Sequence, residues 1–383
     1  MSIIRLCEQI EDTRIDRKRE HSVEVIVYIA MAAVICGAES WNEIEEFGRS
    51  RKDFFTERIP SLSHIPSHDT FNRFFSSLSP GYFERVFRCW ISELCGKYEG
   101  IVAIDGKTIR GASKCTRSNP DGENGFKLHM VSAWAAANGI TLGQVKVNQK
   151  SNEITAIPEL LNALDLENCI VTIDAMGCQT AISKKIIERK ADYVLHVKNN
   201  QKNLYKKLQS WFNDLDEKDI DVNKEYYARR YAKYRTEETG HGRREVRDCF
   251  VYNSGVMELI FNEWTGIKSV VRVTAERTIL KTGETSLEKR YYITSLGLEA
   301  KKIADAVRAH WSVENCLHWQ LDVSFGEDMG RKTGNAAQNF SLMNKIALML
   351  LKKSPRKGSI KGKRKAAGWD TEFLCELLLA QNF

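Results

Sequence analysis

The sequence predicts an α/β (α+β) protein in which a mixed sheet is flanked by helices and preceded by a helical region. Apolar residues in the first hundred positions recur at helical spacing, whereas short β-branched runs begin after Gly100. Two of these runs, Ile101-Val-Ala-Ile-Asp105 and Ile170-Val-Thr-Ile-Asp174, share one pattern, an apolar strand followed by an aspartate. Two such strands bring carboxylates to one edge of a sheet, as a divalent-metal site requires.

Length and composition set the broad class. The 383 residues are enough for two or three domains, and 43% hydrophobic with 28% charged residues is ordinary for a soluble protein. The formal charge of +7 is unevenly distributed, because residues 352–365 include eight lysines or arginines and no acid. Such a run either attracts polyanions, usually nucleic acid, or forms a solvated linker.

The chain carries no sign of export or membrane insertion. Charges recur throughout the first 24 residues, which is unlike a signal peptide, and the uncharged stretch 25–38 is too short to span a bilayer. The ten cysteines form no Cys-x-x-Cys pair, which fits reduced thiols. We therefore expect a cytoplasmic, nucleoid-associated protein that has no membrane partner.

Residues 1–99 are predicted to form an all-helical domain. An apolar helix is predicted to run from Val23 and to end near Gly37, and the capping box Ser40-x-x-Glu43 begins the next helix. Pro66-Ser67 caps a third helix, and a fourth begins at Pro80 and ends at Gly96. Two short helices around a turn fit a helix-turn-helix that binds DNA ends. A structural bundle fits equally well, because the aromatic positions mostly describe a packed face.

The next part of the chain is predicted to be a sheet. Gly106 is expected to turn the backbone sharply after Asp105, and Asn138-Gly139 predicts a hairpin between strands 127–135 and 140–147. A helix (156–164), the Asp174 strand, a helix (179–190) and a strand (191–197) follow. Three strands, helix, strand, helix, strand is the order of a ribonuclease H-like sheet with mixed pairing.

The remaining segments complete four predicted domains. Residues 199–290 are highly charged and suit a mostly β insertion with a basic edge that includes Arg243 and Arg244. A strand at 291–295 and helices at 301–325 and 336–351 return to the main fold. The catalytic core is thus predicted as 100–198 with 291–351, followed by a basic linker and C-terminal helix over 352–383.

A third carboxylate is predicted on the helix 301–325. On a helical wheel Glu314 falls on the apolar face with Val307 and Leu321, and His310 and His318 flank it. A glutamate on an apolar face is costly unless it is neutralised, so this pattern indicates either a site or a buried salt bridge. With Asp105 and Asp174 it would bind two Mg²⁺ ions about 3.5–4 Å apart, and Mn²⁺ could substitute.

Five stretches match a known family: Ile65-Pro-Ser-His-Asp-Thr-Phe71, Ala103-Ile-Asp-Gly-Lys-Thr-Ile-Arg-Gly111, Leu128-His-Met-Val-Ser-Ala133, Asp174-Ala-Met-Gly-Cys-Gln179 and His310-Trp-Ser-Val-Glu-Asn-Cys-Leu-His-Trp-Gln-Leu-Asp-Val323. With them the chain resembles bacterial insertion-sequence DDE transposases of the H-repeat-associated group, over roughly residues 10–351. The resemblance implies a ribonuclease H-like fold and the catalytic triad Asp105, Asp174 and Glu314. It also implies metal-dependent cleavage and strand transfer on double-stranded DNA, carried out by a homodimer that joins two ends.

The sequence departs from the wider group's signature Tyr-x2-Arg-x3-Glu-x6-Lys. The flanking positions here are Val307, His310 and Leu321, so an arginine and a lysine that elsewhere hold DNA phosphates are absent. Asn315 and Asp322 are expected to contact the metal ligands without binding the ion themselves. The side chains expected to contact DNA instead are Lys107, Arg110, Arg243, Arg244, Arg308, His310, His318 and Arg331.

Other functions fit less well. A phosphate-binding P-loop would need a glycine five positions before Gly106, where Ile101 stands, and a zinc hydrolase would need His-Glu-x-x-His or clustered Cys and His. Two alternatives stay open. One is a DNA-binding protein descended from a transposase that no longer cuts, and the other is a general ribonuclease H-like, metal-dependent nuclease.

Overall fold

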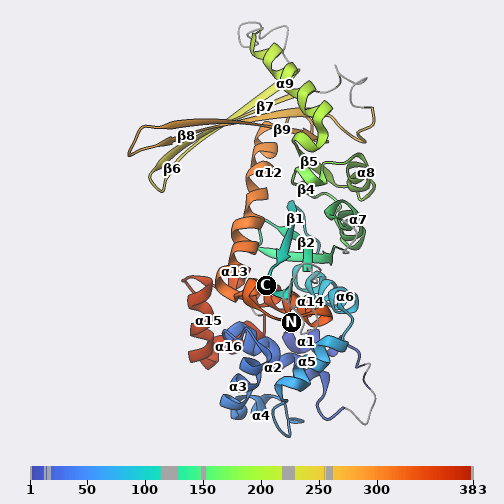
Figure 1. Ribbon diagram of the computed structural model, residues 1–383, viewed down its shortest axis with the longest axis vertical. Helices are drawn as coiled ribbons and strands as arrows, with labels where there is room; N and C mark the ends of the chain where they lie inside the picture. The colour runs from blue at the N-terminus through green and yellow to red at the C-terminus, as the bar shows by residue number, and fades with distance from the viewer. Residues whose placement is uncertain are drawn as a thin grey trace. The chain divides into compact units, whose positions relative to one another are not determined.

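The computed structural model describes residues 2–12, 14, 19–113, 128–147, 152–217, 229–253, 255 and 262–380 (Figure 1). The chain divides into two compact units, which alternate along the sequence. Unit 1 comprises Met1–Lys97, Gly106–Asn152 and Glu314–Phe383, and unit 2 comprises Tyr98–Asp105 and Glu153–Val313.

Unit 1 begins with six helices, and the local signals in the sequence set their ends. The helices are α1 (Ile3–Glu8), α2 (Val23–Cys36), α3 (Trp41–Ser50), α4 (Lys52–Arg58), α5 (His68–Ser77) and α6 (Pro80–Cys95). Ser22 and Ser67 cap α2 and α5, and the predicted capping box of Ser40 and Glu43 is present. Gly37 ends α2 with φ of 122°, a conformation that favours glycine.

Helix α2 is the centre of unit 1. Twelve of its fourteen residues are buried, and α1, α3, α5, α14, α15 and α16 pack around it. Among the described residues no single helix is long and apolar enough to cross a membrane, although α2 and α3 pass that test as a pair bent by 96°. The aromatic residues Phe71, Phe74 and Phe75 of α5 are buried, so they form a packed face as predicted.

The predicted hairpin also belongs to unit 1. Strands β2 (Leu128–Ala135) and β3 (Ile140–Lys146) pair antiparallel, and Gly139 in the turn has φ of 67°. Lys127, predicted as the first strand residue, lies outside the described residues. The long buried helix α14 (Gly334–Lys353) packs against β3, α2 and α5.

The C-terminal helix predicted within residues 352–383 is present, whereas part of the basic run before it, predicted as a linker, is also helical. Residues 360–378 form two helices, α15 (Ile360–Trp369) and α16 (Thr371–Leu378), and two cations of the basic run lie inside the protein. Lys363 Nζ donates to the carbonyls of Leu351 and Ser354, both at 2.9 Å, at the end of α14. Part of this run therefore satisfies helix C-terminal carbonyls instead of facing solvent.

Unit 2 contains a mixed sheet with the strand order β1-β4-β5-β9-β8-β7-β6. Its strands are β1 (Ile101–Ile109, of which the first five residues are in this unit), β4 (Ile170–Ile173), β5 (Asp192–Val197), β6 (Tyr231–Gly240), β7 (Arg243–Asn253), β8 (Ser269–Ile279) and β9 (Thr285–Thr294). Neighbours among β1, β4 and β5 are parallel, and the others are antiparallel. Helices α7 (Glu153–Ala163) and α8 (Thr180–Glu188) complete the predicted ribonuclease H-like order.

The segment predicted as a mostly β insertion extends this sheet, because β8 pairs with β9 and β9 pairs with β5. It also contains a helix that was not predicted, α9 (Lys202–Glu217). Its buried residues are Leu204, Leu208, Phe212 and Leu215, which recur at helical spacing within a charged stretch. Residues 218–228, 254 and 256–261 of the insertion lie outside the described part of the chain.

The helix predicted over 301–325 is not a continuous α-helix. It consists of α12 (Ala300–Ser312), a π-helical turn η6 (Val313–His318) and α13 (Trp319–Phe325). In unit 2, α12 packs on β4, β5, β6 and β7. Single π-helical turns inside α-helices are rare and often mark functional sites.

Candidate functional site

Two of the three predicted carboxylates lie together in unit 2. Strands β1 and β4 are parallel, and Ile104 pairs with Ile173 in their register. The next residue on each strand is an aspartate, so Asp105 and Asp174 are neighbours at the end of this pairing. The sharp turn predicted at Gly106 was wrong, because β1 continues through it to Ile109.

Asp174 is held in one orientation by the backbone that follows it. Its Oδ1 accepts hydrogen bonds from the N–H groups of Met176 and Gly177, at 3.0 and 3.4 Å, and thereby caps a short 3₁₀ turn. Burial raises the pKa of Asp174, and the nearby carboxylates of Glu153 and Asp105 raise it further, although the two backbone bonds act in the opposite direction. A bound cation would relieve this crowding of negative charge.

Glu153 was missed in the sequence. It is the first residue of α7, which was predicted to begin only at residue 156, and its charge affects Asp174 more than that of Asp105 does. The available signal was an acidic residue ahead of the apolar run 154–161, because acids favour the first turn of a helix. Glu153 adds a third carboxylate to this edge of unit 2.

Gly177 allows the turn after Asp174 to pack closely. A Cβ at this position would overlap Ile173 Cγ2 and lie 3.1 Å from Ile157 Cδ1. We expect Gly177→Ala to lower the free energy of unfolding by about 1–3 kcal/mol, because the overlap must be relieved by moving buried side chains. Urea denaturation measures the loss. The control is Gly297→Ala in the same unit, where a Cβ would meet open space, and equal stability of the two variants would contradict the expectation.

Glu314 lies in the π-helical turn, and its side chain is exposed. The buried residues here are Val313, Leu317 and Leu321, so the prediction of Glu314 on the apolar face was wrong. The wheel assumed a regular α-helix, whereas the π-helical turn alters the rotation per residue. The border between the compact units falls between Val313 and Glu314, so Glu314 is grouped with unit 1 and the two aspartates with unit 2.

Three of the four predicted DNA contacts of unit 2 have protein partners. His310 Nδ1 lies 3.1 Å from the hydroxyl of buried Thr172 on β4, two residues before Asp174. Arg308 Nη2 donates to Glu238 at 3.2 Å, and Arg244 Nε donates to Glu237 at 2.6 Å. Arg243 is exposed at the start of β7.

A pocket that sequence reasoning missed opens beside Asp174. Its volume is about 510 Å³. It is lined by residues after β4, residues at and after the end of β5, one residue of α9 and residues 288–290 within β9. Lys198, Lys289 and Arg290 line it together with the carboxylates of Asp174 and Glu288, and Glu288 pairs with Arg290 at 2.7 Å. Tyr205 and His196 contribute aromatic rings. These residues are distant from one another in sequence, so no local motif announces them.

In unit 1, Lys107 lies in a cluster of acids, which does not support the predicted contact with DNA phosphates. Its Nζ is 2.6 Å from Asp322 Oδ1, 3.2 Å from Glu327 Oε2 and 3.4 Å from Asp328 Oδ1, and only 10% of its side chain is exposed. Asp322 is thus a partner of Lys107. Arg110, by contrast, is 84% exposed and lies 3.6 Å from Asp328.

The structure places the other predicted site residues of unit 1 in the π-helical turn or after it. Arg331 and Asn315 are exposed, and His318 is half-buried within the π-helical turn. Arg331 lines a pocket with residues of α3 and α5. Their predicted roles toward DNA and the metal ligands stay predictions.

We expect Lys107→Ala to lower the free energy of unfolding by about 3–5 kcal/mol, because it leaves three close carboxylates without their cation. Burial alone would lower the pKa of Lys107, but Glu327, Asp322 and Asp328 outweigh it and raise the pKa. The raised pKa means that this stabilisation is fully present below the ordinary lysine pKa and is lost as the pH rises through the alkaline range.

Urea denaturation at neutral pH measures this loss. The matched control is Arg110→Ala, which removes an exposed cation next to Asp328 and should change stability by less than about 1 kcal/mol. An unchanged stability of Lys107→Ala, together with weaker DNA binding and a shallower salt dependence, would restore the role in phosphate binding.

Comparison with known families identifies the chain. The family described as "Transposase DDE domain" matches residues 97–350, and the family "DDE_Tnp_1-associated" matches residues 4–91. The chain belongs to the DDE transposase family. The match confirms the resemblance found in the sequence. The matched region, residues 97–350, contains Asp105, Asp174 and Glu314.

Similar proteins span nearly the whole transposase chain. Two that are named as putative transposases are YncI of Escherichia coli O157:H7 and the H repeat-associated YhhI of Escherichia coli K12. YncI is 40% identical over 98% of this chain and 94% of its own length, and YhhI is 36% identical over 99% and 98%. Escherichia coli K12 YbfL is 37% identical over 99% and 98%.

A solved structure is also similar to this chain. A piggyBac transposase synaptic complex with hairpin DNA aligns over 98% of this chain and 78% of that chain, with a TM-score of 0.39 and 10% identity. A similarity at that level is too low to support a statement about fold or function.

Proposed function

We propose that this transposase cleaves DNA strands at insertion-sequence ends and transfers them to a target by metal-dependent phosphodiester displacement. The observation that supports this most is the placement of Asp105 and Asp174 after paired residues of two parallel strands. Glu153 adds charge beside them. We propose further that Glu314 joins the two aspartates in the active complex with DNA, and that a homodimer holds the two ends.

The residues present fit a divalent cation. Asp105 and Asp174 follow paired residues of two parallel strands, and burial together with the negative charges of Glu153 and Asp105 raises the pKa of Asp174. A donor set made of carboxylate oxygens favours Mg²⁺ or Mn²⁺ over zinc. Asp105, Asp174 and Glu314 would hold the metal, which when bound activates water or a 3′-hydroxyl and stabilises the leaving oxygen.

The protein's own groups would orient the DNA and the ligands. The two backbone N–H groups that bind Asp174 Oδ1 fix this carboxylate before DNA arrives. Lys198 and Lys289 in the adjacent pocket would contact the phosphates next to the cleaved bond. Arg110, Arg243 and Arg331 are exposed and would extend this contact along the duplex.

An assay in vitro with the element's own ends and Mg²⁺ tests the proposal. We expect nicks at the ends followed by products joined to a target DNA. Cleavage of any DNA at random would favour a general nuclease. Specific binding of the ends without Mg²⁺-dependent cutting would favour a DNA-binding protein that has lost the reaction.

A further inference from the structure

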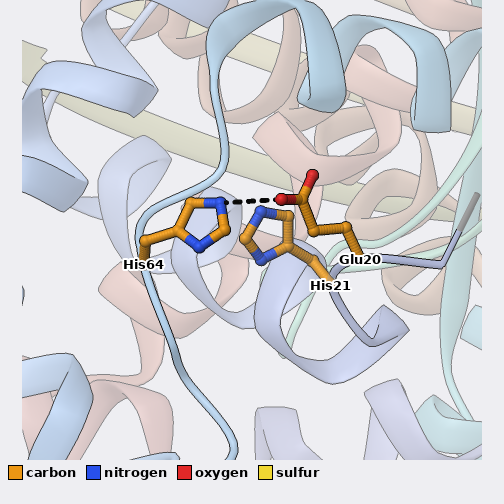
Figure 2. Close-up of side chains that lie close together, drawn as sticks. All are labelled: Glu20, His21 and His64. Atoms are coloured by element: carbon orange, nitrogen blue, oxygen red, sulfur yellow. Dashed lines mark ion pairs between the residues drawn. The ribbon is translucent and has the colours of Figure 1, made fainter.

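Three side chains that the proposed function does not use converge in the helical part of unit 1. Glu20 and His21 directly precede α2, and His64 lies in the loop between α4 and α5. Figure 2 shows the three side chains directed toward one another from these two segments. One ligand atom from each residue lies within 4.8 Å of the others. None of the three residues is near the proposed catalytic carboxylates in sequence.

The distances are close to those of a tetrahedral metal site. Two donors that each lie 2.0–2.1 Å from a tetrahedral zinc ion are about 3.4 Å apart. His64 Nε2 and Glu20 Oε1 are already 3.3 Å apart. The rings of His21 and His64 meet edge to face, with centroids 4.5 Å apart and an interplanar angle of 64°. All three donors already lie within 4.8 Å of one another, so closer approach of His21 would place three donors around one ion.

Neighbouring groups hold the two histidines for this role. Ser63 Oγ lies 3.0 Å from His64 Nδ1, which leaves Nε2 directed to Glu20, and ligating histidines usually bond through their second nitrogen in this way. His21 is 4% exposed, and Arg14 Nη2 donates to its carbonyl at 2.7 Å. The charge of Arg14 is balanced by Asp12 at 2.8 Å.

We propose that Glu20, His21 and His64 bind one transition-metal cation of the zinc class, with the fourth position open to water. Two imidazole nitrogens and one carboxylate favour such an ion over Mg²⁺, which prefers oxygen ligands alone. The side chains of Glu20 and His64 are 71% and 53% exposed, so an ion can enter from solvent. Binding would join the start of α2 to the loop before α5 and so stabilise the N-terminal helices.

Zinc binding to the full chain tests the proposal. The protein is prepared without a histidine tag and carries Asp105→Asn, Asp174→Asn and Glu314→Gln, so that the proposed catalytic ligands cannot account for any ion bound. We expect one equivalent of Zn²⁺ in equilibrium dialysis, and visible absorption of a tetrahedral ion when Co²⁺ is used. At a hundredfold excess over the dissociation constant, Zn²⁺ should raise the melting temperature by about 5 °C.

Substitutions assign the ion to this cluster. In the same background, His64→Ala and Glu20→Gln should each weaken Zn²⁺ binding at least about tenfold, and both residues are exposed enough to be replaced without unfolding the protein. His68→Ala is the control, because His68 is a 50% exposed histidine of the same region that pairs with Glu45. Unchanged binding in His64→Ala, or no binding tighter than about 10 μM, would leave Glu20 and His64 as an ordinary ion pair and end the proposal.

Discussion

Replacement of any one of the proposed ligands, in Asp105→Asn, Asp174→Asn or Glu314→Gln, should lower DNA cleavage at least about 1,000-fold. Each change keeps the size of the side chain and removes its charge, so the cation that the carboxylates hold is lost or misplaced. Metal-derived stabilisation of the transition state is worth several kcal/mol, and about 4 kcal/mol corresponds to this factor. DNA affinity should stay nearly unchanged, because its main source is the cations that contact phosphates.

Single-turnover cleavage of labelled ends with Mg²⁺ measures the first quantity, and a gel-shift titration measures the second. The matched control is Glu159→Gln, which removes an exposed carboxylate from α7 in the same unit as the aspartates. It should cut as fast as the unmodified protein. If one of the three variants still cuts at that rate, its residue has no part in the reaction. Such a result for Glu314 alone would point to Glu153 as the third ligand.

The features that were predictable from sequence depend on residues within one turn of each other. Ser67 and the Ser40–Glu43 box define helix starts because the capping side chain bonds a backbone group three residues away. The Asn138-Gly139 hairpin is similarly local. The two aspartates were predictable because the same pattern occurs twice, and strands with that pattern pair side by side.

The features that were missed depend on partners far along the chain. Lys107 looked available to DNA because its counterions, Asp322, Glu327 and Asp328, follow more than 200 residues later. A helical wheel assumes the rotation per residue of a regular α-helix, so it cannot detect the π-helical turn at Glu314. The pocket beside Asp174 combines residues from three strands and a helix that are distant in sequence, and only the fold brings them together.

The environment of the basic run 352–365 also depends on partners far along the chain. Removal of this run is expected to have the second large effect. Its charge predicted a DNA-binding tail or a linker, yet Arg364 is 4% exposed and its guanidinium lies 4.1 Å from the centroid of the Phe325 ring. Arg364 Nη2 donates to Val34 O at 2.8 Å, near the end of α2. Helices α15 and α16 together bury five apolar side chains: Ala367, Phe373, Leu374, Leu377 and Leu378.

Truncation after Leu351 should therefore cost more than about 5 kcal/mol of unfolding free energy, or prevent unit 1 from folding. Loss of a single buried leucine or phenylalanine side chain costs about 2–5 kcal/mol, and the truncation removes several together with the partners of the α2 and α14 carbonyls. Thermal and urea denaturation measure the loss. Weaker DNA binding by the truncated protein would follow from unfolding and says nothing about direct contact.

Substitution of the exposed cations separates the two effects. Lys357, Lys361 and Lys365 are exposed members of the same run, whereas Arg356 pairs with Asp370 at 3.0 Å. Joint replacement of the three lysines by alanine should leave the unfolding free energy within about 1 kcal/mol of the original value. If these three cations contact phosphates, the slope of log affinity against log salt should become shallower by up to about 2.7. An unchanged slope would give the run a purely structural role, and a truncated protein that melts at the original temperature would contradict the packing argument.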